Sequence, residues 1–151
     1  MRKIILIAII ILLSGCGSVI SREARRGVDR SITPSMVQIE PDTYSNQKII
    51  WGGIIISTNN LKDRSIIEVL HIPSKRTGEA GGSESPQGRF LINAIGYLDP
   101  LTYRKDMKIV VAGSIKGIVV KKLDVMEYTY PLIEPVEMHL FNPGEERVSP
   151  Y

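Results

Sequence analysis

The chain has 151 residues, 43% of them hydrophobic, and 19 lysines and arginines stand against 16 acidic residues. This length suffices for about one modest domain. A single cysteine excludes an internal disulfide, and the small charge excess gives little support for nucleic-acid binding, which would need a basic surface.

The first fifteen residues have the three zones of a secretory signal. Arg2 and Lys3 form a short basic segment, residues 4–13 are an unbroken apolar run, and small residues follow. This combination predicts an export signal, residues 1–15, that is removed from the mature protein. Arg2 and Lys3 leave with it, so 17 basic residues remain against 16 acidic ones.

The end of this signal, Leu13-Ser14-Gly15-Cys16, matches the lipobox of bacterial lipoproteins at every position. The Cys16 thiol is the nucleophile that would accept a diacylglyceryl group, because sulfur attacks well once deprotonated. Ser14 and Gly15 are small enough for a signal peptidase that cuts between Gly15 and Cys16. We therefore predict that Cys16 is the mature N-terminus and carries S-diacylglycerol, and the resemblance to bacterial lipoproteins implies an N-acyl group on its freed amine. We expect no cofactor besides this lipid.

An uncleaved membrane anchor is the alternative for the same segment. No charge occurs from Ile4 to Ile20, which is roughly the minimum length of a membrane-spanning helix. Small and polar residues dilute the second half of that run, and both flanks are positive, so the orientation would be poorly specified. We therefore favour the lipobox interpretation.

Gly17 follows the predicted lipidated cysteine. In enteric-type bacteria an aspartate at this position commonly retains a lipoprotein in the inner membrane. The resemblance to that class therefore implies transfer to the outer membrane, with the domain facing the periplasm.

Residues 16–47 comprise the lipidated cysteine and a segment that is polar and mixed in charge, with Pro34 and Pro41. We expect a solvated tether containing a short helix at 21–29 and a short strand at 36–39. Its arginines could contact anionic lipid headgroups.

Strand patterns begin at residue 48. The expected strands are 48–57, 65–72, 88–98 and 108–121, and the pattern is completed by 125–133 and 136–141. A turn is expected at 58–63, a long loop at 74–87 and a short helix or turn at 99–103. The barrel domain is thus 48–141, followed by a flexible tail at 142–151.

Several of these strands are apolar on both faces, as in a closed and well-covered barrel. Gly52 and Gly53 predict a bulge or tight bend inside the first strand, and Gly113 and Gly117 predict bends in the fourth. The fold class is all-β and mainly antiparallel. We expect a small closed or partly open barrel of OB-like layout, which consists of three strands, a helical connection and two more strands.

A series of short motifs in fixed order resembles the Slp family of outer-membrane lipoproteins, a starvation-inducible group. After the lipobox, the matching pieces are Trp51-Gly52-Gly53, Ile67-Glu68-Val69-Leu70, Gly88-Arg89-Phe90, Tyr97-Leu98-Asp99-Pro100 with Tyr103, Val111-Ala112-Gly113 with Gly117, and Tyr128-Thr129-Tyr130-Pro131. The family has no established enzymatic activity. The resemblance therefore implies a location more strongly than an action.

Residues that could support catalysis or metal binding are sparse. His71 and His139 both lie in strand patterns without an acidic partner at metal-ligand spacing, so we predict no metal site and no catalytic residues. The possible carboxylate pairs, Glu127 with Glu134 and Asp99 with Asp106, are interpreted as solvated charges. Asp99, before Pro100, is expected to cap the helix or turn that follows.

Aromatic residues could form a ligand-binding face on the barrel, since OB-type barrels can hold oligosaccharides. The candidates are Trp51, Tyr97, Tyr128, Tyr130 and Lys116, with Phe90, Tyr103, Lys121 and Lys122 as further members. The alternative is that the rings fill a cysteine-free core while the lysines keep an edge strand soluble. We favour this alternative.

The sequence therefore predicts an outer-membrane-anchored, periplasm-facing, non-enzymatic lipoprotein that acts in the envelope during starvation or stress. The alternative function is a periplasmic binding module for a glycan or other envelope ligand. The expected partners are membrane lipid through Cys16, the lipoprotein processing and sorting machinery, and an envelope protein or glycan. Nucleic acid is not an expected partner.

Overall fold

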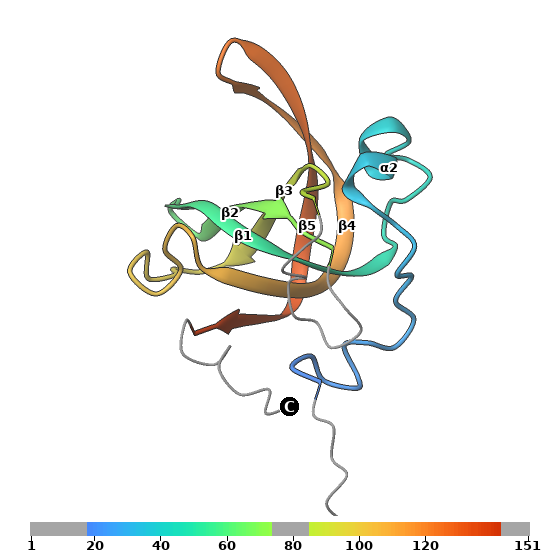
Figure 1. Cartoon of the computed structure of the whole chain (residues 1–151), viewed down its shortest axis with the longest axis horizontal. Helices are drawn as coiled ribbons and strands as arrows, with labels where there is room; N and C mark the ends of the chain where they lie inside the picture. The colour runs from blue at the N-terminus through green and yellow to red at the C-terminus, as the bar shows by residue number, and fades with distance from the viewer. Residues whose placement is uncertain (1–17, 74–84, 143–151) are drawn as a thin grey trace, which may run out of the picture.

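Five strands form a closed barrel in the computed structural model, which describes residues 18–73 and 85–142 (Figure 1). One short helix, α2, lies beside the barrel. The elements are α2 Pro34–Ile39, β1 Lys48–Asn60, β2 Arg64–His71, β3 Arg89–Ile95, β4 Lys108–Leu123 and β5 Met126–Phe141.

The barrel closes because β1 pairs along both of its edges, with β2 on one and with β4 on the other. The strand order is β1-β2-β3-β5-β4; the β3–β5 pairing is parallel, and the other pairings of these five strands are antiparallel. This confirms the predicted all-β, mainly antiparallel, closed OB-like barrel. The connection before β4 is a turn, which Asp99 caps by accepting hydrogen bonds from the Leu101 backbone N–H (2.9 Å) and the Thr102 hydroxyl (3.2 Å).

The barrel interior is filled by branched aliphatic and aromatic side chains. Along β2 buried residues alternate with partly buried ones, as expected for a strand with one face to the core. The main core consists of Ile32, Val37, Ile49, Trp51, Ile55, Ile67, Val69, Phe90, Ile92, Met107, Ile109, Val111, Ile115 and Ile133.

A second apolar cluster covers the outer face of β1 and β4. Ile50, Val110 and Ala112 alternate with core residues and so point out of the barrel, where Ile20 packs on them. Ile20 is only 1% exposed. The apolar residues on the outer face of these strands are therefore buried by the chain that precedes the barrel.

The expected tether is thus wrong for the part that the structure describes, because this segment is docked on the barrel. The Asp29 backbone N–H donates to the Lys48 carbonyl (3.0 Å), and Val28 forms a parallel bridge with Lys48. Residues 22–27 form turns where we expected a helix at 21–29. These long-range contacts leave no signal in local sequence periodicity.

The strand expected at 36–39 is instead part of helix α2. Thr33 is its N-cap and accepts a hydrogen bond from the Met36 backbone N–H, and Pro34 occupies the first turn, where a missing N–H costs nothing. Val37 is fully buried, and the Gln38 side chain donates to the Thr129 carbonyl on β5 (2.8 Å). Capping and packing together override the short apolar run.

The glycines of β4 lie at bulges as predicted, whereas the bulge of β1 lies beyond Gly53 and not at Gly52 and Gly53. The pairing of β1 with β2 shifts between Ile55 and Ser57, and the pairing of β4 with β5 shifts at Gly113 and again before Gly117. A Cβ on Gly113 would lie 2.3 Å from the Glu134 carbonyl oxygen. Gly117 has a φ of 124°, which a residue with a side chain rarely adopts.

The segments 125–133 and 136–141, expected separately, form one continuous strand, β5. Its prolines are tolerated because Pro135 pairs with Gly113 at one bulge and Pro131 pairs with Ile118 just beyond the other. Past these bulges, β4 and β5 rise out of the barrel as a two-stranded ribbon, residues 116–131 (Figure 1). Val125 and Met126 are exposed at its tip.

The remaining boundaries differ slightly from expectation. β1 continues to Asn60 and shortens the turn before β2, while β3 ends at Ile95 because Gly96 turns with a φ of 86°. Most of the expected loop at 74–87 and of the tail at 142–151 lies outside the described residues.

Candidate functional site

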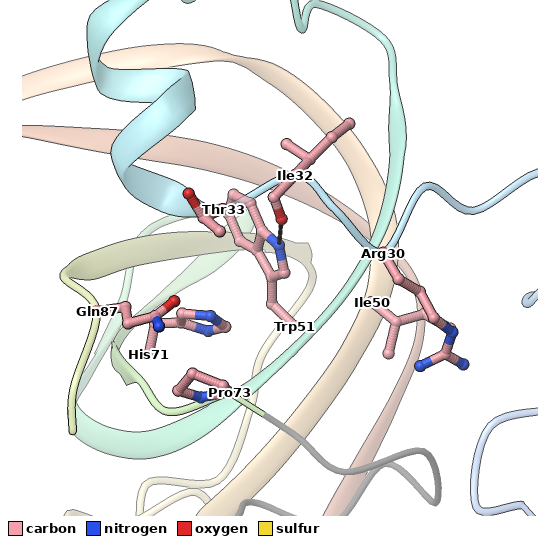
Figure 2. Close-up of a pocket in the computed structure, with 8 residues that line it drawn as sticks. All are labelled: Arg30, Ile32, Thr33, Ile50, Trp51, His71, Pro73 and Gln87. Atoms are coloured by element: carbon pink, nitrogen blue, oxygen red, sulfur yellow. Dashed lines mark hydrogen bonds between the residues drawn. The ribbon is translucent and has the colours of Figure 1, made fainter. Parts of the chain in front are cut away.

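A hollow of about 320 Å³ opens where the chain entering α2 passes the ends of β1 and β2 (Figure 2). It combines apolar walls with a few polar groups, which is typical of small-ligand sites. Its lining residues are Arg30, Ile32, Thr33, Ile50, Trp51, His71, Pro73 and Gln87.

Trp51 separates this hollow from the barrel core. Its indole N–H donates to the Ile32 carbonyl (2.9 Å), which holds the incoming chain against β1 (Figure 2). The ring packs against His71 at 5.7 Å and Phe90 at 5.2 Å between centroids. Only 3% of Trp51 is exposed, so it acts mainly as a core residue.

His71 is the buried titratable group of the site. Its Nδ1 lies 3.0 Å from the Gly52 carbonyl oxygen, and since a carbonyl only accepts, Nδ1 carries the proton and Nε2 is an acceptor. Burial lowers the pKa of His71 from 6.5 to about 4, and the hydrogen bond to Gly52 opposes only part of this shift. The imidazole is therefore neutral at physiological pH.

The chemistry available in the hollow is that of a binding pocket. A neutral imidazole of low pKa is a weak base, and the Thr33 side chain already accepts a hydrogen bond from the Met36 backbone N–H (3.4 Å). Among the described residues, no group of three histidine, cysteine or acidic side chains is placed to hold a metal ion. His139, the second histidine, is half-buried and packs on Phe141 at 4.9 Å.

A separate polar cluster joins β2, β3 and β5. Glu68 Oε1 accepts hydrogen bonds from Arg89 Nη1 (2.9 Å) and from the Tyr130 hydroxyl (3.0 Å). The Tyr128 hydroxyl accepts from the Arg89 backbone N–H (2.9 Å), and burial raises the pKa of Tyr130. The parallel β3–β5 pairing comprises two residue pairs, so these side chains reinforce a short seam of the barrel.

The structure does not gather the predicted ligand face into one surface. Tyr128 and Tyr130 touch at 4.7 Å, but Tyr130 is 2% exposed. Trp51 packs in the main core and lines the hollow of Figure 2, whereas Tyr97 is 73% exposed just after β3. Lys116 donates to the Asn46 side chain (3.2 Å).

The other rings and lysines agree in part with the interpretation that the aromatic residues fill the core and the lysines keep a strand soluble. Phe90 is fully buried and Tyr103 packs against the core, while Lys121 and Lys122 are exposed on the ribbon. Lys121 Nζ lies 5.9 Å from the Tyr130 ring centroid. Core filling therefore accounts for most of these aromatic residues.

Sequence reasoning missed Arg30, Thr33 and Gln87 as neighbours of Trp51, and it missed the Glu68–Arg89 pair. These contacts join residues far apart in the chain, and no local spacing signals them. Gly15 and Cys16, the predicted cleavage and lipidation site, lie outside the described residues. In the part of the chain that is described, no helix has the length and apolar character to cross a membrane.

The chain is similar to one protein family over nearly its whole length. The profile of the family described as "Outer membrane lipoprotein Slp family" matches residues 13–151. No solved structure matches significantly.

Similar proteins occur in two bacteria. The "Uncharacterized lipoprotein YeaY" of Escherichia coli (strain K12) is 25% identical over 82% of this chain and 64% of its own length. "Outer membrane protein Slp" from the same organism is 27% identical over 75% of this chain and 60% of its own. An "Uncharacterized protein" of Haemophilus influenzae is 31% identical over 55% and 45%, respectively. The chain thus spans less than two thirds of the length of these relatives.

Proposed function

The chain belongs to the outer membrane lipoprotein Slp family, and from this premise we propose that its mature form is a non-enzymatic lipoprotein anchored by lipid on Cys16. The anchor lies in the periplasmic leaflet of the outer membrane, and the barrel faces the periplasm. The observation that carries this proposal is Leu13-Ser14-Gly15-Cys16, which directly follows a basic and then apolar export signal. Lipidation uses the one thiol of the chain.

We propose that the barrel acts by contacting other components of the cell envelope during starvation or stress. The resemblance to a starvation-inducible family supports the setting. The burial of Trp51 and Tyr130 removes two of the rings on which a glycan would stack, so protein or surface contacts are the better supported mode. The hollow beside His71 is the feature that keeps a small envelope ligand as the second candidate.

The anchor is tested by Cys16→Ala in cells fed radiolabelled palmitate. We expect complete loss of label and loss of signal cleavage, because the acylated sulfur is the substrate that the lipoprotein peptidase recognises. Ser14→Ala is the matched control, since it keeps a small residue two positions before Cys16 and should leave labelling unchanged. Persistent label in Cys16→Ala would overturn the anchor.

The membrane and its face are tested by fractionation and protease treatment. Wild-type protein should sediment with outer membranes and resist protease in intact cells, but become degraded once that membrane is permeabilised. Gly17→Asp should shift most of the protein to the inner membrane, while Gly17→Ser should not. Degradation in intact cells would contradict the periplasmic face.

A further inference from the structure

The chain that leads from Cys16 to the barrel is very short. Ile20 is buried against β1 and β4, and the Ser21 backbone N–H donates to Glu137 Oε1 on β5 (3.0 Å). Ile20 is four positions after Cys16, and a fully extended chain covers at most about 14 Å over that length. A lipid on Cys16 would therefore bring this docked segment to the bilayer surface.

The docked segment, residues 21–30, presents a row of cations to solvent. Its arginines are all exposed, and none forms an ion pair with another described residue; they are Arg22, Arg25, Arg26 and Arg30. Its acidic residues are Glu23 and Asp29, and the Asp29 carboxylate already accepts hydrogen bonds from Ser31. The surface is therefore positive, and its guanidinium groups form no ion pair with the described residues, while Arg25 Nε donates to the Ser21 carbonyl (3.3 Å).

The apolar residues of the same segment point the other way. Ala24 and Val28 are partly buried and pack on the outer cluster of β1 and β4. The turns at residues 22–27 are held by backbone hydrogen bonds such as Arg25 N–H to Ser21 C=O (3.2 Å). The segment thus has a packed side and a cationic side, and the packing fixes the direction in which the arginines face.

We propose that this segment binds the phosphate headgroups of anionic phospholipids and holds the barrel in a fixed orientation on the membrane. The inference rests on the proposed lipidation of Cys16. Guanidinium groups bind phosphate in two-point contacts, and several together add to attraction by a negative surface. The β4–β5 ribbon lies at the opposite end of the molecule from the start of this segment, so its tip points away from the bilayer (Figure 1).

The test uses mature, lipidated protein carrying Met126→Cys at the exposed ribbon tip. With the Cys16 sulfur acylated, this is the only free thiol, and it takes a fluorescent donor. The protein is placed in vesicles that contain an acceptor-labelled lipid, made of phosphatidylcholine alone or with phosphatidylglycerol. Energy transfer then reports how close the tip comes to the bilayer.

We expect lower transfer in the anionic vesicles than in the neutral ones, because the tip is held away from the surface. Substituting Arg22, Arg25 and Arg26 together by glutamine should weaken the oriented state on the order of 100-fold and restore the neutral-vesicle transfer. High salt should have the same effect. A charge-matched control substitutes exposed Lys62, Arg104 and Lys105 by glutamine and should change nothing.

Equal transfer in both kinds of vesicle, or an equal effect of the control set, would overturn the inference. Vesicle flotation separates it from the anchor: protein that fails to float with neutral vesicles refutes lipidation and this inference together. Protein that floats with both kinds of vesicle but shows the same energy transfer in both refutes the orientation alone.

Discussion

Replacing Gly53 by alanine is expected to destabilise the barrel by about 3 kcal/mol or more. A Cβ at this position would lie 2.0 Å from the Leu70 carbonyl oxygen and 2.8 Å from Val69 Cγ1. The first of these is a backbone atom of β2, so no side-chain rotation relieves the overlap. β1 and β2 must therefore separate at this position.

Urea unfolding followed by the fluorescence of Trp51, the single tryptophan, measures this loss. Gly96→Ala is the matched control, because an added Cβ meets nothing within 4 Å there and only the φ of 86° opposes it. That conformational strain alone should cost about 1 kcal/mol. Similar costs for the two substitutions would show that β1 and β2 are not in close contact at Gly53.

Acidification is expected to destabilise the protein through His71. Its pKa is about 4 in the folded protein, below the ordinary value of 6.5, so the unfolded chain binds a proton first as pH falls. The contribution to stability is complete above pH 6.5 and is lost progressively between pH 6.5 and 4. The full loss is about 3 kcal/mol at the lower limit.

The measurement is the free energy of unfolding from pH 7.5 to 4.5 in the wild type and in His71→Phe. Phenylalanine keeps the ring contacts with Trp51 and Phe90, and the Gly52 carbonyl retains the Ile72 backbone N–H (3.0 Å). The variant should lose much of the acid sensitivity above pH 5, where few carboxylates titrate. An unchanged pH profile in His71→Phe would contradict the buried neutral imidazole.

The two effects have a common structural origin at the junction of β1 and β2. Gly53 lets the strands approach closely, and the Gly52 carbonyl next to it accepts from both His71 Nδ1 and the Ile72 backbone N–H. This junction forms one wall of the hollow in Figure 2. Changes here therefore affect both barrel closure and the shape of the candidate pocket.

The fold class could be predicted because its signals are local. Runs of branched residues set the strand positions, and Gly113 and Gly117 marked bends that coincide with bulges of β4. The family resemblance rested on ordered short motifs, which the profile match over residues 13–151 confirms. None of these inferences required knowing which distant residues meet.

The role of individual side chains could not be predicted in the same way. Trp51 and Tyr130 have the composition of a ligand face, yet both are buried. The Glu68 carboxylate joins Arg89 and Tyr130 only because β2, β3 and β5 become neighbours. The burial of a side chain and its hydrogen-bond partners depend on how the barrel closes, so a pattern of residue types does not predict them.

The sequence by itself determined the Slp-family membership and the β character of the barrel, and it predicts the export motif ending at Cys16, because each is written in contiguous residues. Only the tertiary structure decided that residues 20–47 pack on the barrel instead of forming a tether. The reason is that residues 20–47 gain their stability from Ile20, Ile32 and Val37, which are buried by strands far along the chain.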